Sequence, residues 1–184
     1  MTTAERYCLT AFLADALTLA RLSIGAAILW LGWMVGRAAL PQAILLATAG
    51  WITDGVDGFI ARHSHCKTRL GWIDFPVDVA LTWAALLFLV MAGFLSLAPT
   101  VIYTLLAILG TLWFRKKAVL ILFMRGIDLT AFFFAVRYAL TYTLPLLAWL
   151  ALLAWLHRQR LRRDVPRWLR ELANLFSHPF HRDP

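Results

Sequence analysis

The sequence predicts an all-α integral membrane protein with six transmembrane helices and a short interfacial helix at each end. Of its 184 residues, 61% are hydrophobic, whereas a soluble domain has about 45–50%. The mean hydropathy is +0.72, and the apolar residues form runs close to the ~20 residues that a helix needs to cross the hydrocarbon. We expect no signal peptide, because Asp15 interrupts the first run and another full span follows it.

Six spans are predicted, at residues 14–35, 40–62, 71–93, 97–114, 118–137 and 142–157. Glycine, proline or charged residues break the chain between them, at 36–41, 62–69, 96–99, 115–117 and 141–145. Residues 1–12 and 164–176 are expected to form the interfacial helices. The chain is therefore divided into a membrane domain, residues 1–157, and a basic cytoplasmic tail, residues 158–184.

The distribution of charge predicts the orientation in the membrane. The formal net charge is +8, and seven of the eighteen Lys and Arg residues lie in the tail. The loops at 62–69 and 115–117 are also basic, and with six spans they fall on the same side as both termini. By the positive-inside rule this side is cytoplasmic, and we expect a bacterial inner membrane. Nucleic acid is excluded as a partner, because no basic soluble domain is present to bind it.

Four aspartates stand out within the apolar sequence. Asp54, Asp57, Asp74 and Asp78 are the only acidic residues between residues 16 and 127. A carboxylate inside a span costs about 2.5–3.5 kcal/mol on insertion scales, and four together also repel one another. The two spans that carry them hold no cationic side chain except Arg62 at the rim. A bound divalent cation, or a pair, would offset this cost, and oxygen ligands favour Mg²⁺ or Mn²⁺.

The spacing of these residues indicates a site for a diphosphate. Asp54, Asp57, Gly58, Ala61 and Arg62 follow one another at i, i+3, i+4, i+7 and i+8, which places them on one helical stripe. Asp74 and Asp78 are separated by one turn on the next helix, which returns antiparallel. Small side chains at 58 and 61 allow a ligand to approach the backbone, and the guanidinium of Arg62 suits a phosphate.

This stretch resembles the signature of the CDP-alcohol phosphatidyltransferase family, Asp-x2-Asp-Gly-x2-Ala-Arg-x8-Gly-x3-Asp-x3-Asp. Every residue type of the signature is present, from Asp54 to Asp78, and Gly71 is its third glycine-or-alanine position. One spacing departs from the family, because only two residues separate Gly71 from Asp74. On a continuous helix, Gly71, Asp74 and Asp78 would still share a face, with Pro76 in the first turns. A shorter segment, Thr18-x-x-Arg21, is similar to the family's first-helix motif.

The resemblance implies metal-dependent transfer of a phosphatidyl group from CDP-diacylglycerol to an alcohol, with release of CMP. It implies that Asp54, Asp57 and Asp74 hold metal, and that Asp78 completes a two-metal site and acts as the general base. It also implies a homodimer in the lipid bilayer. The residues that it assigns to the CDP pocket are Gly58, Ala61, Arg62, Gly71 and Thr18.

The acceptor alcohol is predicted from basic residues outside the signature. Arg115, Lys116, Lys117 and Arg125 would suit the phosphate of an acceptor such as glycerol 3-phosphate. Alternatively, residues 115–117 only satisfy the positive-inside rule, and Arg125 only neutralises Asp128, three residues further along the helix.

Two other functions remain open from the sequence. The chain could be a catalytically inert member of the family, for which the contracted spacing after Gly71 is the only support. It could also be an intramembrane prenyltransferase, although those enzymes need more helices and two separate aspartate motifs. A zinc site at "HSHC", residues 63–66, is disfavoured, because adjacent residues in a short loop seldom provide tetrahedral geometry.

Overall fold

The computed structural model describes residues 9–63 and 71–156, except for the side chains of residues 9–11 and 57–63. This part of the chain is helical and contains no strand. Its elements, in chain order, are α1 (Leu9–Met34), the short 3-10 helix η1 (Gly36–Ala39), α2 (Leu40–His63), α3 (Asp74–Met91), α4 (Leu97–Phe114) and α5 (Lys117–Leu156). The all-α fold class predicted from the sequence is therefore confirmed for the described residues.

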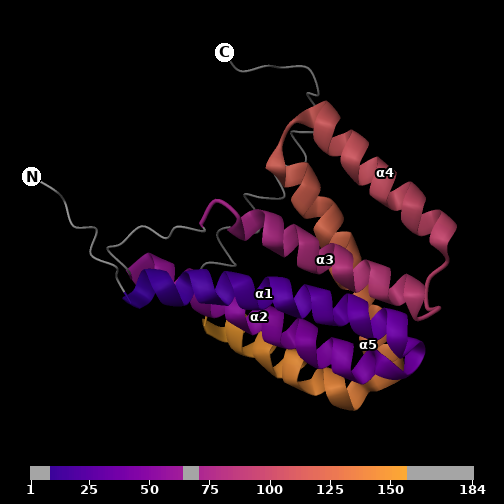
Figure 1. Ribbon diagram of the computed structural model, residues 1–184, viewed down its shortest axis with the longest axis horizontal. Helices are drawn as coiled ribbons and strands as arrows, with labels where there is room; N and C mark the ends of the chain where they lie inside the picture. The colour runs from indigo at the N-terminus through magenta and orange to yellow at the C-terminus, as the bar shows by residue number, and fades with distance from the viewer. Residues whose placement is uncertain (1–8, 64–70, 157–184) are drawn as a thin grey trace, which may run out of the picture.

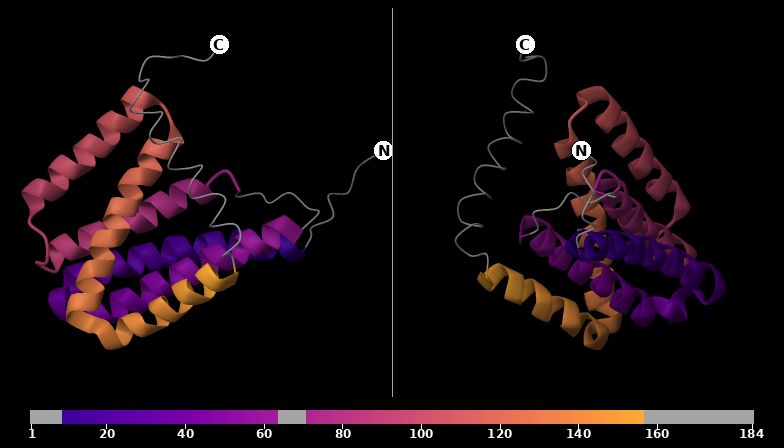
Figure 2. Two further views of the ribbon diagram at one scale, coloured as in Figure 1. Left: turned by 180° about the vertical axis from the view of Figure 1, so that it is seen from behind. Right: turned by 60° about the vertical axis from the view of Figure 1, so that its left-hand side comes forward.

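The first three long helices form the centre of the molecule. α1 packs along both α2 and α3 (Figure 1). α5 contacts α2 and α3, and its final part runs alongside α2 (Figure 2). α4 stands on the outside and contacts α5 and, less extensively, α3. The helices that carry the predicted carboxylates, α2 and α3, are thus both held against α1.

The last two predicted spans meet at a kink inside α5. α5 covers 118–137 and 142–156, but its backbone leaves the helical region at Ala139, where φ is −146° and ψ is 48°, so two helices are joined here. The break predicted at 141–145 therefore lies at Ala139 instead, and Pro145 belongs to the helix that follows the kink. Proline cannot donate to the carbonyl one turn before it, which weakens the helix upstream. The kink at Ala139 lies two residues before that carbonyl, which belongs to Thr141.

Within the described residues, four helices are long and apolar enough to cross a membrane: Phe12–Met34 of α1, α3, α4 and α5. They indicate an integral membrane protein, but the predicted count of six spans is not confirmed. α2, which contains Asp54, Asp57 and Arg62, is not among the four. The predicted N-terminal interfacial helix is not seen as a separate element over residues 9–12, which already belong to α1. Residues 1–8, and the C-terminal helix predicted at 164–176, lie outside the described residues.

α1 and α3 approach each other closely at Gly32. A Cβ atom built on this glycine would lie 3.0 Å from Cε of Met91 and 3.4 Å from the backbone Cα of Phe88. Phe88 is 2% exposed and belongs to the buried core, together with Ile28 of α1 and Ala92. A side chain at position 32 would therefore have to displace the Met91 and Phe88 side chains.

We expect Gly32→Leu to separate α1 from α3 and to lower the thermal midpoint of the purified protein in detergent. Inserting side-chain atoms into a packed core costs about 1–3 kcal/mol. Trp33→Leu is the matched control, because Trp33 is 76% exposed and its replacement changes no core contact. Equal midpoints for the two variants would contradict the close approach.

Candidate functional site

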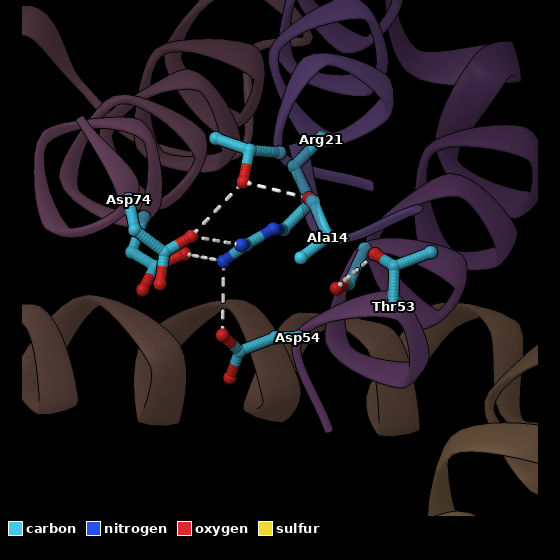
Figure 3. A network of polar contacts seen from close by, with 8 residues as sticks. Ala14, Arg21, Thr53, Asp54 and Asp74 are labelled. Atoms are coloured by element: carbon cyan, nitrogen blue, oxygen red, sulfur yellow. Dashed lines mark hydrogen bonds and ion pairs between the residues drawn. The ribbon is translucent and has the colours of Figure 1, made fainter. Parts of the chain in front are cut away.

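A buried arginine lies at the centre of the predicted acidic site. The Arg21 side chain projects from α1, is fully buried, and forms ion pairs with the three signature aspartates whose side chains the structure describes. One Nη1–Oδ1 distance, to Asp54 on α2, is 2.9 Å. The other two partners are Asp74 and Asp78 on α3. Figure 3 shows the guanidinium between Asp74 on one side and Asp54 on the other. A single cation therefore joins three helices.

The packing one turn away from the ion pairs explains why these residues meet. Leu81, which follows Asp78 by three residues, packs against both Gly25 of α1 and Gly50 of α2. A Cβ on Gly50 would lie 2.8 Å from Cδ2 of Leu81, and a Cβ on Gly25 would lie 3.8 Å from its Cα. Gly25 follows Arg21 by four residues, and Gly50 precedes Asp54 by four. α1, α2 and α3 therefore each carry a charged residue, Arg21, Asp54 or Asp78, about one helical turn from the contact made by Leu81.

The first turn of α3 also favours the site. Asp74 is the first residue of α3, where a carboxylate interacts favourably with the helix dipole. Its Oδ1 accepts a hydrogen bond of 3.3 Å from the hydroxyl of Thr18, which is 5% exposed. Pro76 is the third residue of the helix, as expected, where the lack of an N–H group has no cost. Thr18 is thereby placed beside the carboxylates.

Gly71 does not occupy the predicted position. It lies in an exposed turn before α3, whose N-cap is Ile73, so the expectation that it shares a helical face with Asp74 and Asp78 is wrong. The contracted spacing therefore changes the position of Gly71 in the loop before α3. Asp74 and Asp78 remain one helical turn apart on α3. Asp57, Gly58, Ala61 and Arg62 belong to α2, but their side chains lie outside the described part, as do residues 64–66 of the rejected zinc motif.

Arg21 is the site residue that the sequence-based prediction missed. The apolar context of the four aspartates predicts a cation, and the two helices that carry them offer only Arg62. The cation is on the helix before them. The signal was present in the Thr18-x-x-Arg21 segment, since both of its polar side chains contact Asp74.

The basic residues assigned to the acceptor lie in two places. Arg115, Lys116 and Lys117 are exposed at the α4–α5 turn, where Arg115 has a left-handed backbone with φ 49°. The Lys117 ammonium lies 5.6 Å from the ring centroid of Phe75, the neighbour of Asp74, so this turn is close to the start of α3. Arg125 forms the expected ion pair with Asp128, at 2.9 Å, and remains 62% exposed.

A largely apolar cavity of about 410 Å³ lies beside the ion pairs. Trp51, one turn before Asp54, and Thr82, one turn after Asp78, line it together with the Arg125–Asp128 pair. The remaining lining comes from apolar residues of α2, α3 and α5. A polar group at the carboxylates and an apolar chain in the cavity can therefore belong to one molecule.

The side chains present are chemically suited to a divalent cation. Among the described residues, no group of three His, Cys, Asp or Glu side chains is arranged to hold a metal ion, because the three carboxylates turn toward Arg21. Three carboxylates and one guanidinium nevertheless carry a formal net charge of −2. All of the donors are oxygens, which are the ligands that Mg²⁺ and Mn²⁺ prefer.

Fold and site together define a helical membrane protein with a cluster of carboxylates suited to binding charged ligands. The model of the CDP-alcohol phosphatidyltransferase family matches residues 11–161, and the chain belongs to this family. The match includes Thr18, Arg21 and the complete aspartate signature. No curated protein and no solved structure matches the chain.

Membership of the family gives the general activity. The family transfers a phosphatidyl group from a CDP-alcohol to an alcohol, within a membrane, in phospholipid biosynthesis. The chain is thus a member of a phosphotransferase family. The alternative of an intramembrane prenyltransferase loses its support.

We expect Arg21→Met to lower the thermal midpoint strongly, since it removes the cation that three partly buried carboxylates share. Removing one partner of a buried ion pair typically costs about 3–5 kcal/mol. Arg125→Met removes the same charge from an exposed pair, for which about 0–1 kcal/mol is expected. Thermal unfolding of both variants in the same detergent measures the difference. Equal midpoints would show that Arg21 does not hold the helices together.

Proposed function

We propose that this protein catalyses the transfer of a phosphatidyl group from CDP-diacylglycerol to a polar alcohol, with release of CMP. The observation that carries the proposal is the convergence of Asp54, Asp74 and Asp78 from two helices on one buried arginine. A charged cluster of this kind is costly in a membrane protein, and such residues usually mark a substrate or ion site. The cluster lies within the residues that the family model matches, which supports a catalytic role for it.

The reaction requires one proton transfer and one exchange of phosphorus–oxygen bonds. The acceptor hydroxyl oxygen attacks the phosphorus that bears the diacylglycerol, and Asp78 takes the hydroxyl proton as general base. The bond between this phosphorus and the bridging oxygen breaks, and CMP leaves with the electron pair. Asp54, Asp57, Asp74 and Asp78 would hold Mg²⁺ or Mn²⁺. When bound, the metal supplies charge stabilisation for the diphosphate and for the leaving group.

Arg21 acts in this proposal as a positioning residue. Its guanidinium contacts Asp78 directly and so orients the proposed base. It also links Asp54 and Asp74, which lie on different helices. The hydrogen bond from the Thr18 hydroxyl to Asp74 contacts the same carboxylate from a second direction. The carboxylates are thus held in place before any substrate binds, which lowers the cost of arranging them.

The donor would lie partly at the carboxylates and partly in the apolar cavity. We assign Gly58, Ala61, Arg62, Gly71 and Thr18 to the CDP pocket, following the family signature. One acyl chain would enter the cavity of about 410 Å³ that begins one turn from Asp54 and Asp78. An exposed Gly71 in the turn before α3 leaves room for the nucleotide at the end of the helix.

For the acceptor we propose a phosphorylated alcohol such as glycerol 3-phosphate. Lys117 lies near Phe75 at the start of α3, so the basic turn of residues 115–117 is close to the site. Arg125 is exposed on the wall of the cavity and keeps donors for a phosphate beyond its pair with Asp128. A homodimer with the site and both termini on the cytoplasmic side completes the proposal.

We expect the purified protein to release CMP from CDP-diacylglycerol only when Mg²⁺ or Mn²⁺ and a suitable acceptor are present. Asp78→Asn should abolish this release, by at least about a hundredfold, since general base catalysis contributes about 10²–10⁴-fold. Thr104→Val, on α4 outside the site, is the control and should be active. Monodisperse elution and an unchanged helical circular dichroism spectrum would establish that the Asp78 variant is folded.

Two results would contradict the proposal. Full activity of Asp78→Asn, or activity that survives chelation of divalent cations, would exclude the proposed mechanism. No CMP release with any acceptor, under conditions in which the protein is folded, would support the inert alternative.

A further inference from the structure

A second basic cluster lies at the opposite end of the helices from the carboxylates. Arg37 belongs to η1, which joins α1 to α2, and its guanidinium carbon lies 4.5 Å from the ring centroid of Phe94. Phe94 follows the end of α3. The same guanidinium lies 5.4 Å from the ring of Tyr138, immediately before the bend in α5. Residues from two connections between helices and from the bend of α5 therefore meet here.

A second arginine lies against the same tyrosine. The guanidinium carbon of Arg137 is 5.5 Å from the Tyr138 ring centroid. Tyr138 is itself supported by Phe134, whose ring is stacked at 6.1 Å with an interplanar angle of 11°. Phe94 packs against both rings, at 5.2 and 5.5 Å. Two guanidinium groups are thus held beside one ring of a fixed aromatic cluster.

No ion pair of either arginine with a carboxylate is seen among the described residues. No acidic residue occurs in the sequence between 16 and 53, between 79 and 127, or between 129 and 163. Arg37, Arg137 and Tyr138 are exposed. A guanidinium over an aromatic ring is attracted by the ring face, and its N–H groups remain free to donate in its own plane.

The surroundings of the cluster place it at a membrane surface. α1 and α3 end here, α4 begins here, and large apolar side chains at these helix ends are exposed. Trp33 is 76% exposed and Leu97 is 63% exposed. Tryptophans and arginines at helix ends lie at the level of lipid headgroups. Because the surrounding surface is apolar, a phosphate attached to acyl chains fits this position better than a phosphate free in water.

We propose that Arg37 and Arg137, held on Phe94 and Tyr138, bind the phosphate of an anionic phospholipid in the leaflet opposite the carboxylate site. The bound headgroup would join the α1–α2 connection to the bend of α5. Arginine and phosphate form paired, charge-assisted hydrogen bonds, which are stronger than neutral ones. This site is separate from the one in which we place the reaction and does not depend on the proposed activity.

Native mass spectrometry of the full chain in detergent tests this proposal, with phosphatidylglycerol or phosphatidylcholine of the same acyl chains added. We expect Arg37→Gln/Arg137→Gln to bind one phosphatidylglycerol fewer than the wild type, with an apparent affinity for that lipid reduced by roughly tenfold or more. Tyr138→Leu keeps both charges but removes the ring, and we expect the same loss. Tyr142→Leu, the same change one turn further along α5, should bind as the wild type does.

Each other outcome would overturn the proposal. Unchanged lipid binding in the double arginine variant would exclude the site. If the double arginine variant loses phosphatidylglycerol binding but Tyr138→Leu does not, the binding comes from diffuse attraction between charges and not from the proposed site. Equal retention of phosphatidylcholine would exclude selection of an anionic headgroup, and equal affinity for inorganic phosphate alone would make it a site for free phosphate. Thermal unfolding of each variant identifies any that is misfolded. Arg37→Lys/Arg137→Lys then takes the place of the misfolded variant. We expect it to lose part of the phosphatidylglycerol binding, because lysine lacks the planar donors.

Discussion

The ion pairs of Arg21 are the interaction on which the rest of the structure depends. A buried guanidinium without partners would be prohibitively costly in an apolar helix bundle, and so would three carboxylates without a cation. The guanidinium and the carboxylates each reduce the energetic cost of burying the other. Because they come from α1, α2 and α3, their ion pairs also fix the relative positions of these helices. The packing of Leu81 against Gly25 and Gly50 supplies the close approach that the short ion pairs need. Charge and packing are therefore two parts of one constraint.

This arrangement connects stability with the proposed chemistry. A cluster with three carboxylates and one guanidinium keeps a surplus of negative charge, and in the proposed function this surplus would favour binding of a divalent cation. The apolar cavity begins one turn from the same residues, and basic side chains lie at its wall and near the start of α3. A lipid with a charged diphosphate has the same order of parts: an apolar chain, then a strongly anionic group. This correspondence supports the proposal that the donor is an amphipathic lipid.

The sequence predicted those features that depend on local periodicity. The helical segments follow the apolar runs, and the i, i+4 spacing of Asp74 and Asp78 brings both to Arg21. The partner of the carboxylates was missed because an ion pair between helices depends on tertiary packing, and Arg21 is more than thirty residues away from Asp54. The bend at Ala139 and the start of α3 after Gly71 were misplaced for a related reason. Proline and glycine indicate that a helix is weakened, but the surrounding contacts decide where it bends or begins.

The most direct measurement of the central claim is titration of the purified full-length protein with Mn²⁺, followed by electron paramagnetic resonance of the free ion. Saturable binding is predicted, and Asp74→Asn should weaken it by about tenfold or more, because a carboxylate ligand is lost. Asp128→Asn, which removes a carboxylate paired outside the cluster, should bind Mn²⁺ as the wild type does. Absence of saturable binding, or equal binding by the two variants, would contradict the assignment of the Arg21 cluster as the metal site of this phosphatidyltransferase family member.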